Sequence, residues 1–101
     1  MCFLNKTGLN LSKIVLHDMT QDSYSDNFIG DGVLLNDGYT LMGVSLDVYA
    51  DSSEWELIVT DEVNTEHHLG CDDLKGYSKE NTAIELNYDP ETGEGSAILV
   101  H

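Results

Sequence analysis

The sequence predicts an all-β protein: a mainly antiparallel β-sandwich of about seven to eight short strands, immunoglobulin-like or a similar Greek key, with at most one or two short helical turns. Three observations indicate this class. No window of about 12 residues keeps apolar side chains at helical spacing. Turn signals rich in glycine or aspartate recur about every 8 to 12 residues. Between those turns, apolar and polar side chains alternate, as they do along a strand with one buried face.

The chain opens with two predicted strands. Residues 2–5 form the first, and residues 6–8 form a tight turn in which Gly8 can adopt a positive φ. Residues 9–19 form the second strand, because their side chains alternate between two faces. The polar segment 20–32 that follows is expected to be a long loop.

Part of this loop is expected to contact the core. Ser25 can cap one turn of helix, and that turn would place Phe28 and Ile29 against the apolar interior. The Asp-Gly pair at residues 31–32 then turns the chain.

A strong turn signal occupies the middle of the sequence. Residues 36–38 read Asn-Asp-Gly and separate the apolar segments 33–35 and 39–42, which predicts a hairpin. Residues 44–48 alternate between apolar and polar side chains and are expected to form a half-buried strand.

The clearest alternation lies in residues 55–60, which would bury Trp55 and place glutamates in water. We expect this segment to be a core strand. Residues 61–64 turn the chain into another strand at 65–69, and residues 72–75 are expected to form one helical turn.

The last two strands are predicted at residues 83–88 and 96–101, joined by a hairpin loop at 89–93. The inward positions of all these strands define the expected core. Its members are Ile14, Leu16, Leu34, Leu41, Val44, Leu46, Val48, Trp55, Leu57, Val59, Ile84, Leu86, Ile98 and Val100.

Length and charge restrict the possible functions. The 101 residues are expected to form one domain, residues 1–101. Four lysines, no arginine and 19 acidic residues give a net charge of −15. Direct binding to nucleic-acid phosphates needs clustered positive charge, and so does docking on an anionic membrane, so neither is expected. A basic partner or a cation is compatible with this charge.

Two further features concern the compartment. The sequence contains no long apolar segment of the kind that crosses a membrane and no apolar signal-peptide core, so a cytoplasmic location is the default expectation. Cys2 and Cys71 cannot make a disulfide framework, although a single bridge between them is compatible with the sequence.

Several motifs resemble those of a group of small acidic bacterial β-sandwich modules of unassigned function. The motifs are Asn5-Lys6-Thr7-Gly8, residues 27–32, Asp37-Gly38, residues 55–62 and Asp73-Leu74. The resemblance covers about residues 4–86 and implies a compact β-sandwich. It implies no catalytic residue, because the group offers none.

A zinc site is the first candidate for chemistry. His67 and Cys71 have the ligand types that zinc prefers, and His68 lies beside them. Their spacing matches no standard zinc motif. In a strand His67 and His68 point to opposite faces, so only one of them can readily join Cys71. Exposed histidines and a buried cysteine are the favoured interpretation.

Calcium is the second candidate, because two loops are rich in the carboxylate oxygens that calcium prefers. Loops at one end of a sandwich can combine carboxylates from different turns, and a bound cation would reduce their mutual repulsion. The candidate ligands are Asp22, Asp26, Asp31, Asp89, Glu91 and Glu94. The alternative is a solvated acidic surface.

The sequence contains no nucleophile motif, phosphate-binding glycine loop or metalloprotease motif, so we do not expect an enzyme. It favours a non-enzymatic acidic binding module, with a basic protein surface as the partner. The alternatives are a calcium-stabilised structural or surface domain and an inhibitor or immunity protein that mimics DNA. Aromatic anchors for a partner are expected in or beside turns: Tyr24, Phe28, Tyr39, Tyr49 and Tyr77.

Overall fold

The structure, a computed structural model, describes residues 1–46, 48–71, 74 and 83–100. In these residues it has eight strands and no α-helix, which confirms the all-β class. The strands are, in chain order, β1 (Cys2–Lys6), β2 (Leu11–Asp18), β3 (Ser23–Tyr24), β4 (Thr40–Leu41), β5 (Trp55–Asp61), β6 (Glu66–Gly70), β7 (Ala83–Asp89) and β8 (Glu94–Val100).

Over the described ranges, the strands form one hydrogen-bonded sheet in the order β3-β2-β5-β6-β8-β7-β1-β4. Most neighbours are antiparallel, as predicted, but β1 pairs with β7 in parallel and so does β6 with β8. Local sequence signals do not indicate these two pairs, because parallel neighbours are not joined by a tight turn.

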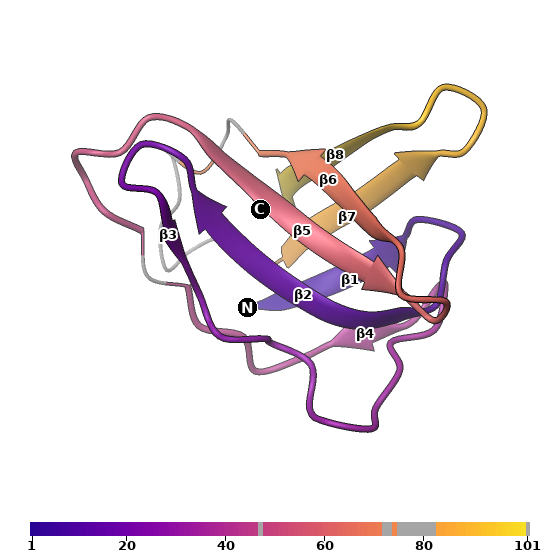
Figure 1. The fold of residues 1–101 in the computed structure, drawn as a ribbon. Helices are drawn as coiled ribbons and strands as arrows, with labels where there is room; N and C mark the ends of the chain where they lie inside the picture. Colours follow the sequence, from indigo (N-terminus) through magenta and orange to yellow (C-terminus); the bar gives the residue numbers. More distant parts are fainter. Residues whose placement is uncertain (47, 72–73, 75–82, 101) are drawn as a thin grey trace.

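The sheet curls strongly into a half-barrel (Figure 1). Strands β2, β5 and β6 run across the direction of β1, β7 and β8, so the two halves of the sheet enclose a common core. The halves are joined where Leu69 pairs with Gly95 and Gly70 with Ser96. A Cβ atom on Gly95 would lie 2.2 Å from Leu69 Cδ2, so a larger residue here would force the Leu69 side chain to move. The two layers that a sandwich keeps separate are thus continuous along this side.

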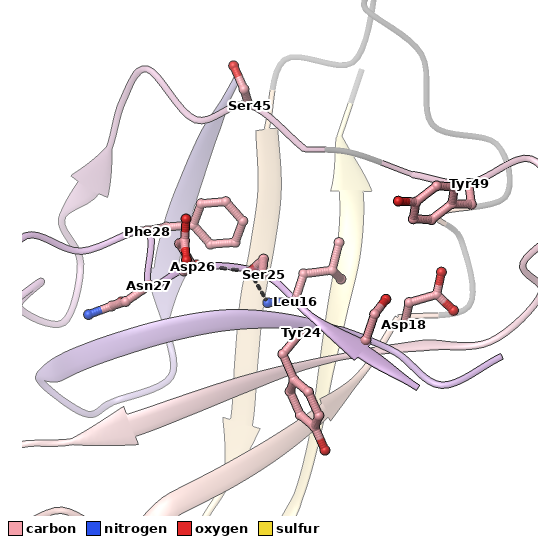
Figure 2. Close-up of a pocket in the computed structure, with 10 residues that line it drawn as sticks. Leu16, Asp18, Tyr24, Ser25, Asp26, Asn27, Phe28, Ser45 and Tyr49 are labelled. Carbon is pink, nitrogen blue, oxygen red and sulfur yellow. Dashed lines mark hydrogen bonds between the residues drawn. The ribbon is translucent and has the colours of Figure 1, made fainter. Parts of the chain in front are cut away.

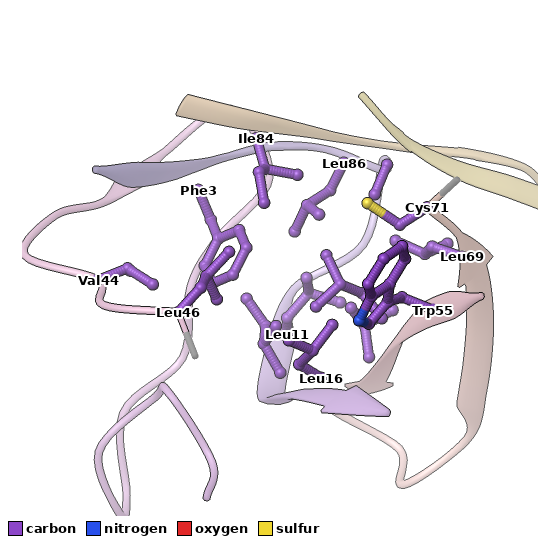
Figure 3. Close-up of a cluster of buried hydrophobic side chains, with 14 of the residues drawn as sticks. Phe3, Leu11, Leu16, Val44, Leu46, Trp55, Leu69, Cys71, Ile84 and Leu86 are labelled. Carbon is purple, nitrogen blue, oxygen red and sulfur yellow. The ribbon is translucent and has the colours of Figure 1, made fainter. Parts of the chain in front are cut away.

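The apolar core lies between the two halves (Figure 3). Phe3, Ile84 and Leu86 enter it from β1 and β7, and Leu16 and Trp55 enter it from β2 and β5. Nine of the predicted core residues are buried: Ile14, Leu16, Val44, Leu46, Trp55, Leu57, Val59, Ile84 and Leu86. Three others are half-buried: Leu41, Val48 and Val100.

Two core predictions are wrong. Leu34 is 44% exposed, and Leu35 is buried instead because it bridges to Leu11. Ile98 is 45% exposed because β8 presents Ala97, its neighbour, to the interior opposite Leu86 on β7. Side chains alternate between the two faces of a strand, so an assignment that is wrong by one residue places each of them on the wrong face. This is the error made for β8.

Two element predictions also need correction. No strand forms in the described part of residues 44–48, although Val44 and Leu46 are buried. The turn at 36–38 is present, with Gly38 at a φ of 82° and a hydrogen bond from Tyr39 N–H to the Asn36 carbonyl. It does not join a hairpin, because the segment before it bridges to Leu11 and the segment after it pairs with β1.

The C-terminal hairpin is as predicted. Gly93 takes a φ of 73° and donates its N–H to the Asp89 carbonyl, which closes the loop between β7 and β8. Of the helical turn expected at residues 72–75, only Leu74 lies among the described residues, and its side chain is buried. Tyr77 and His101 also lie outside them.

Candidate functional site

The segment after β3 runs along the free edge of β2 and positions one side of a groove. The N–H of Ser25 donates to the Leu16 carbonyl, and the Leu16 N–H donates to Ser25 Oγ, both at 2.9 Å. Further along, the Phe28 N–H donates to the Ile14 carbonyl at 2.9 Å. Ser25 therefore caps the edge of β2 and does not begin a helical turn, which corrects the sequence prediction. Phe28 and Ile29 do pack against the core, as predicted.

Between this segment and Tyr49 lies a hollow of about 410 Å³, which we call the acidic groove. Figure 2 shows Phe28 and Asp26 on one side, Asp18 and Tyr49 on the other, and Leu16 between them. The remaining lining residues are Ser23, Tyr24, Ser25, Asn27 and Ser45. The Tyr24 ring points to the opposite side of β2, so Phe28 and Tyr49 supply the aromatic faces.

Asp18 is the most buried charge of the acidic groove, at 5% exposure. Its carboxylate accepts hydrogen bonds from the N–H groups of Thr20 and Gln21, both at 3.0 Å, and from Ser52 Oγ. Burial acts to raise the pKa of Asp18, but these hydrogen bonds outweigh it and lower the pKa. Asp18 is therefore ionised at neutral pH. Among the described residues no lysine forms an ion pair with it.

A second cluster lies on the outer face of β2, β5 and β6. His17 donates from Nδ1 to Glu56 at 3.0 Å and from Nε2 to Asp22 at 3.1 Å, and Glu56 also bonds His68. The Tyr24 ring stacks on His17 with centroids 4.1 Å apart. Burial acts to lower the pKa of His17, but the two carboxylates outweigh it and raise the pKa. Because carboxylates only accept hydrogen bonds, His17 can donate to Glu56 and Asp22 at the same time only when both of its ring nitrogens carry protons.

The structure does not bring His67 and Cys71 together as zinc ligands. His67 bonds Asp61 at 2.9 Å and its ring contacts Tyr88, whereas Cys71 is fully buried in the core. Four residues of extended chain separate them by about 13 Å, beyond the span of one metal ion. The opposite orientations predicted for His67 and His68 are confirmed by their different partners. No disulfide joins Cys71 to Cys2.

The calcium candidates are also dispersed. Asp22 bonds His17, Asp26 lines the acidic groove, and Asp31 is exposed beyond it. Asp89 ends β7, Glu91 lies in the loop that follows, and Glu94 begins β8; this end of the hairpin lies far from β3 (Figure 1). In the described part of the chain, no three histidine, cysteine or acidic side chains are grouped closely enough to hold a metal ion.

The sequence indicated the aromatic residues of the site but not its charged centre. Tyr49 and Phe28 were expected near turns, and both line the acidic groove. Asp18 and Glu56 were missed, because each is one acid among many in the sequence. The alternation that places Trp55 inward also places Glu56 outward, and only the pairing of β2 with β5 shows that Glu56 faces His17.

Comparisons with known proteins return no relatives. No protein-family model matches the chain, and no curated protein or solved structure is significantly similar to it. Among the described residues, no helix has the length and apolar character needed to cross a membrane.

Proposed function

We propose that this protein is a non-enzymatic binding module that recognises a basic protein surface through the acidic groove. One observation carries the proposal. An ionised, almost fully buried carboxylate, Asp18, lies in a hollow beside an exposed carboxylate, Asp26, and an exposed aromatic ring, Tyr49. Hydrogen bonds within the fold keep this carboxylate ionised and fixed in position, so a basic partner can pair with a preorganised negative charge.

Charge and exposure support the same partner. The net charge of −15 favours encounter with basic proteins and slows encounter with acidic ones. Tyr49 is 61% exposed, and tyrosine is one of the residues that dominate binding energy at protein interfaces. In this proposal the curled sheet has the role expected of the predicted immunoglobulin-like or Greek-key sandwich. It is a rigid core that holds the loop residues in position for recognition.

The test uses a small basic protein, cytochrome c, and the same protein with its lysines succinylated. Isothermal titration calorimetry at about 50 mM and about 300 mM NaCl measures both affinities. We expect saturable binding to the unmodified protein, weaker binding at high salt, and none to the succinylated form. If cytochrome c fails to bind at low salt, the proposed function is wrong.

A matched pair of variants separates recognition at the groove from general charge attraction. Tyr49→Ala removes an exposed ring from the acidic groove, and Tyr39→Ala removes a 65% exposed ring elsewhere; neither changes the net charge. We expect Tyr49→Ala to weaken binding at least tenfold, about 1.4 kcal/mol, and Tyr39→Ala to leave it unchanged. Equal effects of the two substitutions would contradict binding at the groove.

A further inference from the structure

We propose that the acidic groove holds a single arginine side chain of the partner, with its guanidinium group beside Phe28 and Tyr49 and facing Asp18. This inference rests on the proposed function and names the chemical group that the site recognises.

The groove is large enough to admit one long side chain. Its volume of about 410 Å³ lies near the lower end of the range of about 300 to 1,000 Å³ that is typical of ligand sites. The Leu16 side chain can cover the apolar stem of a long residue, while the two rings and the two carboxylates receive its charged end.

The hydrogen-bonding capacity of Asp18 is not exhausted. A carboxylate offers about four acceptor positions, and three are used by Thr20, Gln21 and Ser52. Thr20 and Gln21 share Oδ1, and among the described residues Oδ2 accepts only from Ser52, so the open position lies on Oδ2. An N–H donor from the ligand can occupy it. Asp26 is exposed and adds a second negative charge at the same site.

The aromatic walls favour guanidinium over ammonium. A planar guanidinium group stacks on aromatic rings. It is also less strongly hydrated than an ammonium group, so it gives up less hydration free energy on entering a partly buried site. The Phe28 ring is held in place by Phe3, with ring centroids 5.4 Å apart and planes tilted by 60°. One wall is thus preorganised by the core, and Tyr49 forms the more exposed wall.

Three alanine-rich peptides provide the probes: one with a single arginine, one with lysine at that position, and one with citrulline, which keeps the shape of arginine without its charge. Changes in the backbone amide signals of the protein, followed by NMR during titration, detect weak binding and locate it. We expect the arginine peptide to shift the amides of Asp18, Phe28 and Tyr49. The lysine peptide should bind several-fold more weakly, and the citrulline peptide at least tenfold more weakly.

Two substitutions test the assignment of the walls and charges. Asp26→Asn and Tyr49→Ala should each weaken binding of the arginine peptide several-fold. The controls are Asp31→Asn, which removes an exposed acid outside the acidic groove, and Tyr39→Ala. Both variants should bind the arginine peptide as tightly as the unsubstituted protein does. All four positions are exposed, so the folded spectrum should persist in every variant.

The outcomes distinguish this inference from the proposed function. If cytochrome c binds but the arginine peptide shifts no groove amides, or shifts them no more than citrulline, the arginine site is wrong and the wider function stands. If the lysine peptide binds as tightly as the arginine peptide, the site does not recognise the planar guanidinium group. If neither cytochrome c nor the arginine peptide binds, both proposals are wrong.

Discussion

At the scale of single residues, hydrogen bonds satisfy the buried polar side chains of Asn5 and Asp61, whereas Trp55 Nε1 is buried without a hydrogen-bond partner among the described residues. Asn5 is 1% exposed, donates from Nδ2 to the carbonyls of Leu9 and Leu35, and accepts from Thr7 through Oδ1. Asp61 is 7% exposed and accepts from two backbone N–H groups of the turn that follows it. A buried polar group without such partners would cost about 1 to 3 kcal/mol, so these side chains determine how the turns close.

His17 leads to a prediction about pH. Its folded-state pKa lies above the ordinary value of 6.5, so its ion pairs stabilise the fold fully below that pH, and this stabilisation is lost as the pH rises through the raised pKa. Glu56 behaves in the opposite sense. Burial acts to raise the pKa of Glu56, but hydrogen bonds from His68 and His17 lower it below 4.5. The contribution of Glu56 to the stability of the fold is therefore present above that pH and is lost as the pH falls through the lowered pKa.

We therefore expect the free energy of unfolding to decline as the pH rises above 6.5 and through the raised pKa of His17. The groups that contact His17 are Glu56 on β5, with His68 behind it, and Asp22 and Tyr24 from the β3 side. His17→Gln keeps a polar side chain but cannot be charged, so its decline should be smaller. Urea denaturation across this pH range gives both profiles. Parallel profiles would show that His17 does not titrate as described.

At the scale of elements, the edge of β2 is protected without a full strand. β3 pairs with only His17 and Asp18, and beyond it the side chain of Asn27 replaces a strand partner. Asn27 Oδ1 accepts from the N–H groups of Ile14 and Ile29, both at 3.0 Å. An uncovered edge is a template for aggregation, so this side chain satisfies the edge and holds the segment that lines the acidic groove.

Asn27→Ala should destabilise the protein by about 1 to 3 kcal/mol, because it leaves two backbone N–H groups without their acceptor. Asn27→Asp keeps the acceptor oxygen and should cost much less. Urea denaturation measures the difference, and hydrogen exchange at the Ile14 amide should be faster in the alanine variant alone. Equal stability of the two variants would mean that the Oδ1 acceptor is unimportant.

The predictability of each element depended on how local its signal was. Strand β5 was predicted from its alternation and β7 with β8 from the turn between them, because these signals involve neighbouring residues. The two-residue strand β3 carries no such signal, since it exists only through pairing with β2. Strand β4 lies within the predicted segment 39–42, but its partner is β1 and not the segment 33–35. Among the site residues, Phe28 and Tyr49 were indicated by their place near turns, but the position of Asp18 in the groove was not.

At the scale of the whole molecule, acidic residues far outnumber basic ones, with 19 acidic residues against four lysines. Lys6 lies 3.7 Å from Glu85, and Lys13 is exposed on β2. With a net charge of −15, mutual repulsion opposes the compact state, which has a radius of gyration of 12.5 Å. Screening by salt should reduce this repulsion.

We expect the melting temperature to rise by several degrees between about 20 mM and about 500 mM NaCl, since about 1 kcal/mol corresponds to about 4 to 8 °C in a domain of this size. Calcium chloride at matched ionic strength should give the same rise if screening is the only effect. A larger rise with calcium, reversed by a chelator, would support the calcium-stabilised alternative. No rise with either salt would contradict the repulsion argument.

Residue order alone was sufficient to establish an all-β chain, its excess of negative charge, and the inward position of residues such as Trp55 and Leu57. These properties follow from alternation, turn chemistry and charge, which act over a few neighbouring residues. The tertiary structure alone determined the parallel pairs β1–β7 and β6–β8, the phase of β8 and the meeting of Asp18, Phe28 and Tyr49 in one groove. These depend on the register between segments far apart in the chain, which is set by packing around a shared core.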